Sequence, residues 1–195
     1  MESVAKGQQR ATIWNIPNLL TGFRIFSIPL VVFFLTSPGP LPSFLAALIF
    51  TIAAITDLLD GYFARLHKRE TAVGKLLDPM ADKLLILSGM IMLIPLERIP
   101  AWIVVVIIGR EVAITGLRGI ASAEGVVIAA SRWGKGKMIF QSSALTGLML
   151  HYQYLGINFH ILGMILLWIA LVFTLWSGID YLWKFYQGIV NREDG

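Results

Sequence analysis

The sequence contains no cysteine among its 195 residues, so disulfide bonds, thiolate catalysis and cysteine-ligated zinc are all excluded. Charged residues are also scarce, making up 14% of the chain against 56% hydrophobic residues. A soluble fold of this length has too little interior to hide so much apolar surface. The composition therefore predicts a single integral membrane domain spanning residues 1–195.

The beginning of the chain also lacks the apolar core and small-residue cleavage site of a removable targeting signal. We therefore expect residues 1–15 to remain as a short cytosolic or interfacial segment. The net charge of +4 is modest, and we expect membrane lipids rather than nucleic acid as the surroundings of this protein.

Apolar runs divide the chain into six segments, each close to the twenty residues that a bilayer-spanning helix needs. They lie near 16–36, 42–65, 78–96, 100–122, 136–154 and 158–187. The expected fold class is an all-α integral membrane protein with six transmembrane helices. The last run is longer than a span requires, so we expect it to tilt or to extend beyond the bilayer.

Basic residues are distributed unevenly between the predicted loops, and short loops rich in lysine and arginine stay in the cytosol. If the N-terminus is cytosolic, Arg98 is the only basic residue in a predicted outer loop. The inner side then holds Lys6, Arg10, Arg65, Lys68, Arg69, Lys75, Arg132, Lys135, Lys184 and Arg192. We therefore expect both termini to be cytosolic.

Four aspartates lie at the ends of apolar runs, where a carboxylate is costly and usually functional. Asp57 and Asp60 are three residues apart, and Asp78 and Asp82 are four apart, so each pair shares a helix face. Helix capping would explain Asp78, which precedes a proline at an expected helix start, but not Asp57 inside an apolar helix. Two antiparallel helices would turn the pairs toward each other as a cup of oxygen ligands suited to Mg²⁺ or Mn²⁺.

The spacing around these aspartates resembles the signature of a known family. The chain reads Asp57-x-x-Asp60-Gly61-x-x-Ala64-Arg65, then eight residues, then Gly74-x-x-x-Asp78-x-x-x-Asp82. This pattern is similar in full to that of the CDP-alcohol phosphotransferases, which are six-helix membrane enzymes and usually homodimers. The resemblance implies transfer of a phosphate-linked group from a CDP-activated donor to an alcohol, with release of CMP.

The resemblance also implies a role for each position of the signature. Asp57, Asp60 and Asp78 would be ligands of a two-metal site that holds Mg²⁺ or Mn²⁺. Asp82 would bind the second metal and act as the general base. The positions that would hold the cytidine diphosphate are Gly61, Ala64, Arg65 and Gly74. These residue types suit that role, because glycine permits close backbone approach and a guanidinium pairs with pyrophosphate.

The identity of the acceptor alcohol depends on the second half of the chain. Glu111, Thr115 and Arg118 are spaced so that they share a helix face, which we expect to look into the bundle. Arg110 and Glu111 would either form an internal ion pair that fixes helix packing or contact a substrate, and the sequence leaves both open. Arg118 is nearer the cytosolic end and is the better candidate ligand.

A basic, glycine-rich stretch from 130 to 137 is expected to lead into the fifth helix. Lys135 lies between Gly134 and Gly136 at an expected helix N-terminus, which favours an anion. We therefore predict that a second phosphate binds to Lys135, Lys137 and Arg118. For Arg132 a membrane-anchoring role is an equal alternative.

On the first helix, three polar residues would line the cytosolic mouth of the site: Asn18, Thr21 and Arg24. The alternative is that Asn18 caps the helix and that Arg24 snorkels toward the membrane surface. The sequence does not separate these two explanations.

Within the family, these segments are similar to those of bacterial phosphatidylglycerophosphate synthases. That resemblance implies CDP-diacylglycerol as donor, sn-glycerol 3-phosphate as acceptor, and an active site on the cytosolic face of a bacterial cell membrane. A cardiolipin synthase, which uses phosphatidylglycerol, or an inositol-phosphate lipid synthase would also need a basic acceptor site and stays open. A divalent-cation transporter is disfavoured, because the outer halves of the runs are almost purely apolar and no internal repeat is visible.

Overall fold

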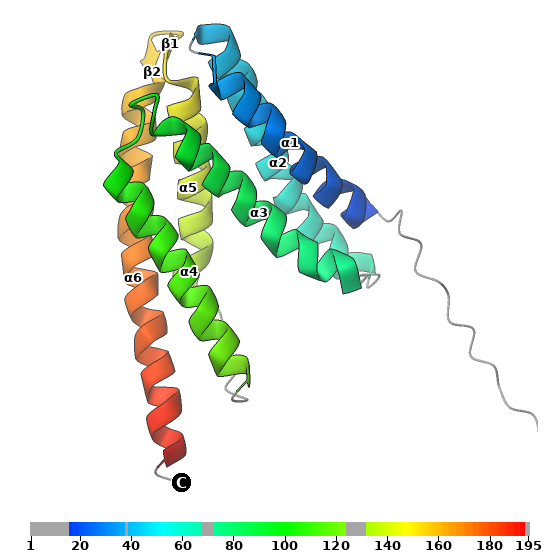
Figure 1. Cartoon of the computed structure of the whole chain (residues 1–195), viewed down its shortest axis with the longest axis vertical. Coiled ribbons are helices and arrows are strands. Elements are labelled where there is room, and N and C mark those ends of the chain that lie inside the picture. Colours follow the sequence, from blue (N-terminus) through cyan, green and yellow to red (C-terminus); the bar gives the residue numbers. More distant parts are fainter. Residues whose placement is uncertain (1–15, 38, 68–71, 124–131, 194–195) are drawn as a thin grey trace, which may run out of the picture.

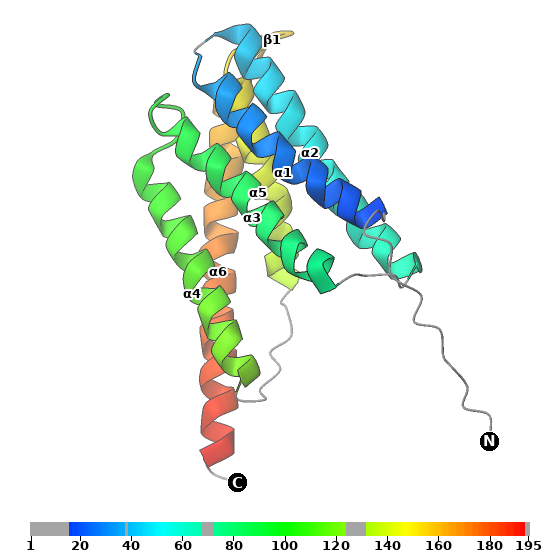
Figure 2. The same ribbon diagram turned by 45° about the vertical axis from the view of Figure 1, so that its right-hand side comes forward.

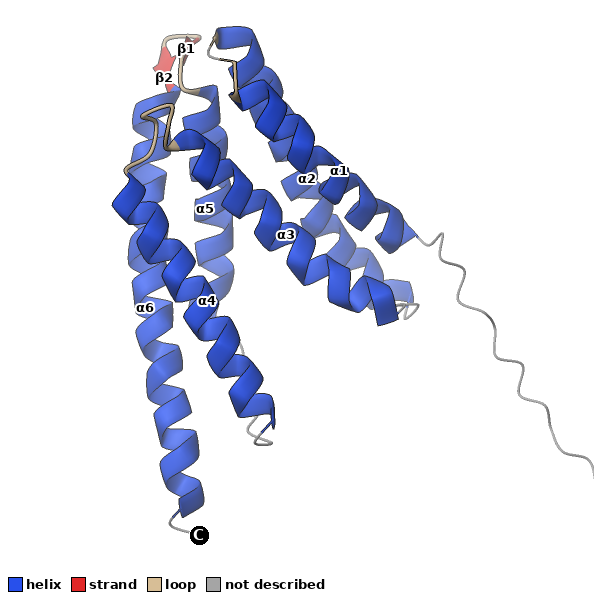
Figure 3. Cartoon of the chain, viewed as in Figure 1, coloured by secondary structure: helices blue, strands red, loops and turns tan. Residues whose placement is uncertain are grey.

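The computed structural model describes residues 16–37, 39–67, 72–123 and 132–193, and within them all side chains except those of 16–18, 57–67, 72–76, 78–79, 132–135 and 189–193. These described residues form six helices and one short hairpin (Figure 3). The elements are α1 (Ile16–Leu35), α2 (Pro40–His67), α3 (Ala72–Leu93), α4 (Ala101–Ala123), α5 (Arg132–Leu150), β1 (Gln153–Tyr154), β2 (Ile157–Asn158) and α6 (Phe159–Glu193). The predicted all-α class is confirmed.

Successive helices alternate in direction, so the bundle has two distinct ends (Figure 1). The upper end holds the α1–α2 connection, the α3–α4 connection and the β1–β2 hairpin. The lower end holds the C-terminal turns of α2, α4 and α6 and the first turns of α3 and α5. Toward that lower end α3 and α4 diverge, as both views show (Figures 1 and 2).

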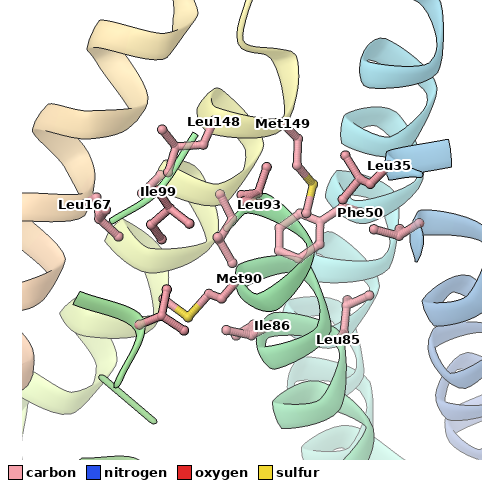
Figure 4. Close-up of a cluster of buried hydrophobic side chains, with 14 of the residues drawn as sticks. Leu35, Phe50, Leu85, Ile86, Met90, Leu93, Ile99, Leu148, Met149 and Leu167 are labelled. Atoms are coloured by element: carbon pink, nitrogen blue, oxygen red, sulfur yellow. The ribbon is translucent and has the colours of Figure 1, made fainter. Parts of the chain in front are cut away.

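The core lies in the upper part of the bundle, where apolar faces from all six described helices meet. α1 packs against α2 and α3, α5 packs against α6, and α2 bridges the two groups through α5. Phe50 of α2, Met90 and Leu93 of α3 and Met149 of α5 are completely buried at this junction (Figure 4). Burial of such large side chains contributes about 1.5–3 kcal/mol each, so this cluster holds the helices in register.

Three helices begin earlier than the sequence predicted. α2 starts at Pro40 rather than 42, because proline has the fixed φ of a first helical residue and no amide hydrogen to leave unpaired. α3 starts at Ala72 rather than 78, since the good helix formers Leu76 and Leu77 carry the helix through Pro79. α5 starts at Arg132 rather than 136, so its two early glycines lie inside the first helical turns.

Among the described residues, one helical stretch is long and apolar enough to cross a membrane, from Phe159 to Gly188 in α6. Only 28% of its most apolar window is buried, so most of that surface faces away from the protein. Two shorter apolar stretches are Leu19–Leu35 and Pro40–Thr56. α3, α4 and α5 are less apolar because each contains charged residues. α6 is 35 residues long, which is more than one span requires. Its tilt or extension beyond a bilayer stays a prediction.

Arg98, the basic residue predicted for an outer loop, lies in the α3–α4 connection at the upper end. It is 3% exposed and donates a hydrogen bond from Nη1 to the carbonyl of Met149, at 2.8 Å. Its guanidinium also lies over the Tyr152 ring, 5.5 Å from the centroid. Arg98 therefore joins the α3–α4 connection to the C-terminus of α5.

Candidate functional site

Both aspartate pairs lie on neighbouring antiparallel helices in the lower half of the bundle. Asp57 and Asp60 fall in the C-terminal part of α2, and Asp78 and Asp82 fall in the first half of α3. Since α2 descends and α3 ascends on either side of one short connection, the chain brings the pairs to the same end (Figure 1). This is the backbone arrangement that a four-carboxylate cup requires.

The side chains of Asp57, Asp60 and Asp78 are outside the described ones, so the ligand geometry stays a prediction. One explanation for Asp78 is nevertheless wrong. Because α3 begins at Ala72, Asp78 lies in the interior of the helix and does not cap it. Asp82 is described, and its side chain is partly buried on α3.

The positions predicted to hold the nucleotide flank the short α2–α3 connection. Gly61, Ala64 and Arg65 lie in the last two turns of α2, and Gly74 lies in the first turn of α3. Their side chains fall outside the described ones, so their contacts with a nucleotide remain predicted. Their backbone position beside the two aspartate pairs agrees with a single donor site.

A charge cluster lies on α3, α4 and α5, centred on Glu111. The Glu111 carboxylate accepts hydrogen bonds from the Lys137 ammonium of α5 and from Arg110 Nη1, the latter at 3.1 Å. The ammonium of Lys83, on α3, lies 3.7 Å from Glu111 Oε1. Three cations thus surround one carboxylate, which leaves a surplus of two positive charges within this cluster.

Arg110 makes the contacts that the packing explanation predicts, while contact with a substrate stays a prediction. Its Nη2 donates a hydrogen bond at 2.8 Å to the hydroxyl of Ser177 in α6, which is 2% exposed. Its Cγ lies 3.4 Å from the point where a Cβ on Gly178 would stand. Arg110 therefore joins α4 to α6, and its contacts are those of a packing residue. Glu111, unlike Arg110, makes its contacts with Lys83 of α3 and Lys137 of α5.

Lys137 is buried, in contrast to Arg118, the other predicted phosphate ligand whose side chain is described. Its side chain is 8% exposed and its ammonium is already paired with Glu111. Lys135 and Arg132 lie in the first turn of α5, with side chains outside the described ones. The helix N-terminus expected near these residues is present, four residues earlier than predicted.

Arg118 lies near the C-terminus of α4, and its residue surface is exposed. Its guanidinium is placed over the ring of Tyr181 in α6, 5.7 Å from the centroid. Tyr181 is itself 6% exposed. A buried aromatic ring thus supports an arginine whose charge remains accessible, as a phosphate ligand needs. Arg118 does not share the contacts of Glu111 and Thr115, although sequence spacing placed all three on one face.

The first helix directs Thr21 and Arg24 into the protein. Thr21 is 3% exposed and Arg24 is 0% exposed, so Arg24 does not snorkel toward a membrane surface. Asn18 lies inside α1, which begins at Ile16, and is therefore not its N-cap. Both alternative explanations for these residues are wrong. Whether Thr21, Arg24 and Asn18 touch a substrate stays a prediction.

Sequence reasoning missed Lys83 and Tyr181 as members of this region. Lys83 directly follows Asp82, and its ammonium donates a hydrogen bond to Thr115 Oγ1 at 2.8 Å. The available signal was its place in the same helical turn as the signature. Tyr181 had no such signal, because α4 and α6 are far apart in sequence and only their packing brings the ring under Arg118.

Comparison with known proteins assigns the family. The family model for CDP-alcohol phosphatidyltransferase matches residues 14–176. A Bacillus subtilis protein named CDP-diacylglycerol–glycerol-3-phosphate 3-phosphatidyltransferase is 37% identical over 192 residues, covering 91% of this chain and 98% of the relative. Proteins of the same name from Haemophilus influenzae and Rickettsia felis are each 39% identical. The first alignment covers 87% of this chain and 92% of the relative, and the second covers 86% and 93%. The chain therefore belongs to the CDP-alcohol phosphatidyltransferase family.

Proposed function

We propose that this protein transfers the phosphatidyl group of CDP-diacylglycerol to sn-glycerol 3-phosphate, giving phosphatidylglycerol phosphate and CMP. The observation that carries the proposal is the identical name of relatives that align over nearly the whole chain. The complete aspartate signature supports the donor chemistry, and the surplus positive charge around Glu111 supports an anionic acceptor. No observation favours phosphatidylglycerol or a phosphorylated cyclitol as the acceptor.

The donor set fits a pair of divalent cations. Four carboxylates on two adjacent antiparallel helices supply hard oxygen ligands, and such an acidic group needs cations to offset its own repulsion. Asp57, Asp60, Asp78 and Asp82 would hold Mg²⁺ or Mn²⁺. When bound, the cations would neutralise charge on the pyrophosphate and on the departing CMP.

The protein's own residues would perform the remaining steps. Gly61, Ala64, Arg65 and Gly74 would seat the cytidine diphosphate. Asp82 would accept the proton of the acceptor's primary hydroxyl as that oxygen attacks the phosphatidyl phosphorus and the bond to CMP breaks. Arg118, Lys135 and Lys137 would bind the phosphate of glycerol 3-phosphate.

We further propose that the six helices span the cytoplasmic membrane of a bacterium, with both termini and the site on the cytosolic side. The excess of lysine and arginine on that side supports this orientation. Residues 1–195 would form one membrane domain, preceded by the interfacial segment 1–15. By the family resemblance the enzyme would be a homodimer, which cross-linking in membranes tests directly.

The deciding experiment uses purified protein with CDP-diacylglycerol, labelled glycerol 3-phosphate and Mg²⁺. We expect the label to enter the lipid phase with one CMP released for each lipid formed. Phosphatidylglycerol and a phosphorylated cyclitol serve as competing acceptors in parallel reactions. CMP release with either of them, and none with glycerol 3-phosphate, would overturn the proposed acceptor.

A further inference from the structure

Lys83 is a cation next to the signature to which the family pattern above gives no role. It follows Asp82 on α3, and its side chain is 36% exposed. Its ammonium donates a hydrogen bond at 2.8 Å to Thr115 Oγ1 and lies 3.7 Å from Glu111 Oε1. The second distance is beyond normal hydrogen-bond length, so the carboxylate attracts Lys83 without binding it closely.

Lys83 and Lys137 contact the same carboxylate in different ways. Lys137 is 8% exposed and hydrogen-bonds to Glu111, so a large part of its charge is already offset. Lys83 is more accessible, and the hydrogen bond that holds it goes to a neutral hydroxyl. Because an ammonium has three donors, Lys83 retains capacity for an anion that arrives from solvent.

The place of Lys83 in the helix also suits an acceptor that carries both a hydroxyl and a phosphate. Consecutive Cα atoms are about 3.8 Å apart, and side chains one residue apart point in different directions from the helix. An acceptor bound here would present its hydroxyl to Asp82 and its phosphate to the neighbouring ammonium. The surplus positive charge of the cluster matches the double negative charge of a phosphate monoester.

Resting on the proposed function, we infer that Lys83 is a further contact for the acceptor phosphate and that Glu111 is its positioning residue. Glu111 lies between Lys83 and Lys137 and offsets part of their mutual repulsion. Thr115, on α4 like Glu111, accepts a hydrogen bond that fixes the direction of the Lys83 ammonium. The two residues of α4 thus hold a cation that comes from α3.

Steady-state kinetics with each substrate varied in turn test this inference. We expect Lys83→Met to raise the KM for glycerol 3-phosphate about tenfold or more, as loss of a charged hydrogen bond does. The KM for CDP-diacylglycerol should stay near the wild-type value, and Lys83→Arg should recover part of the loss. The matched control is Lys184→Met, because Lys184 lies on α6 and pairs there with Asp180.

A double-mutant cycle tests the positioning role of Glu111. Glu111→Gln should also raise the KM for glycerol 3-phosphate, and adding it to Lys83→Met should raise that KM by less than the product of the separate effects. Fully multiplicative effects would overturn the positioning role. Equal damage to both substrates, or no change with Lys83→Met, would overturn the phosphate contact. If glycerol 3-phosphate does not serve as an acceptor for the wild-type enzyme, the proposed function itself is refuted.

A chemical footprint keeps the inference testable if a variant fails to fold. Wild-type protein is treated with an amine-acetylating reagent, and modification of each lysine is measured by mass spectrometry. We expect glycerol 3-phosphate, with CMP present, to protect Lys83 while Lys184 reacts as before. Free glycerol should give no protection. Equal modification of Lys83 with and without glycerol 3-phosphate would contradict the inference.

Discussion

Gly147 of α5 and Gly163 of α6 bring two helix backbones into direct contact. A Cβ placed on Gly147 would stand 2.9 Å from the Cα of Gly163, and a Cβ on Gly163 would stand 2.7 Å from the amide nitrogen of Leu148. Backbone atoms cannot move aside as the end of a flexible side chain can. Helices in a membrane commonly associate through small residues of this kind.

Gly163→Ala should therefore force α5 and α6 apart and destabilise the fold by about 1–3 kcal/mol. The measurement is the thermal unfolding midpoint in detergent. Gly22→Ala in α1 is the matched control, because a Cβ at Gly22 meets nothing within 4 Å. An unchanged midpoint for Gly163→Ala would show that the two helices are not in this contact.

Arg98→Met should remove a charged hydrogen bond and leave the Met149 carbonyl without its partner. We expect destabilisation of about 1.5–3 kcal/mol, the usual contribution of a hydrogen bond to a charged group. Arg98→Lys should restore only part of it, because an ammonium lacks the planar fork that also stacks on Tyr152. Turnover at low temperature should persist in both, since Arg98 lies at the opposite end of the bundle from the aspartates. Lost turnover with an unchanged unfolding midpoint would contradict a purely structural role.

The stability of the upper end should depend on pH through His151. Burial lowers the pKa of His151 below its ordinary value of 6.5, and the nearby charges of Arg98 and His160 add to the effect. Protonation of His151 thus favours the unfolded chain. The contribution of neutral His151 to the free energy of unfolding is complete above pH 6.5 and is lost as the pH falls toward the folded-state pKa.

The variant His151→Asn isolates this contribution. Asparagine does not titrate, and it tolerates the positive φ of 56° found at this position. Between about pH 7.5 and 5.5 the unfolding midpoint of the wild type should fall further than that of the variant. Identical falls would mean that other groups govern the pH dependence.

Tyr181 should matter for the acceptor through Arg118, whose guanidinium lies over its ring. Tyr181→Leu removes the ring, and we expect the KM for glycerol 3-phosphate to rise about two- to fivefold, as for a cation–π contact of 0.5–1 kcal/mol. Tyr181→Phe keeps the ring and should behave like the wild type. If the phenylalanine variant is as impaired as the leucine variant, the hydroxyl rather than the ring supports Arg118.

Metal dependence should follow the aspartate signature. A chelator should stop turnover of the wild type, and added Mg²⁺ or Mn²⁺ should restore it. Asp57→Ala and Asp78→Ala should lose turnover that no added metal restores, because each carboxylate would be shared between cations. Asp180→Ala, at an aspartate that pairs with Lys184 on α6, is the matched control. Normal turnover by Asp57→Ala would refute the two-metal site.

Patterns local in the sequence were sufficient to predict the helices and the donor signature. Apolar runs bounded by Pro, Gly and charged residues predicted all the helices that the structure describes, because the length of a hydrophobic segment is readable without knowing its neighbours. The aspartates could be paired because the helical repeat places residues three or four apart on one face. Helix starts were less predictable, since a proline such as Pro79 is compatible with a first turn and also with a helix interior.

Contacts between distant segments decided the rest. No spacing rule relates Lys83 to Glu111 or Arg118 to Tyr181, because each pair meets only after the helices pack. The sequence left Arg24 open between a site residue and a snorkelling charge, and it placed Arg98 in an outer loop. Both are buried, since packing of neighbouring helices rather than residue type sets exposure. The sequence by itself therefore determined the chemistry available to this protein. The tertiary structure decided which charges pair with each other and which remain accessible to a substrate.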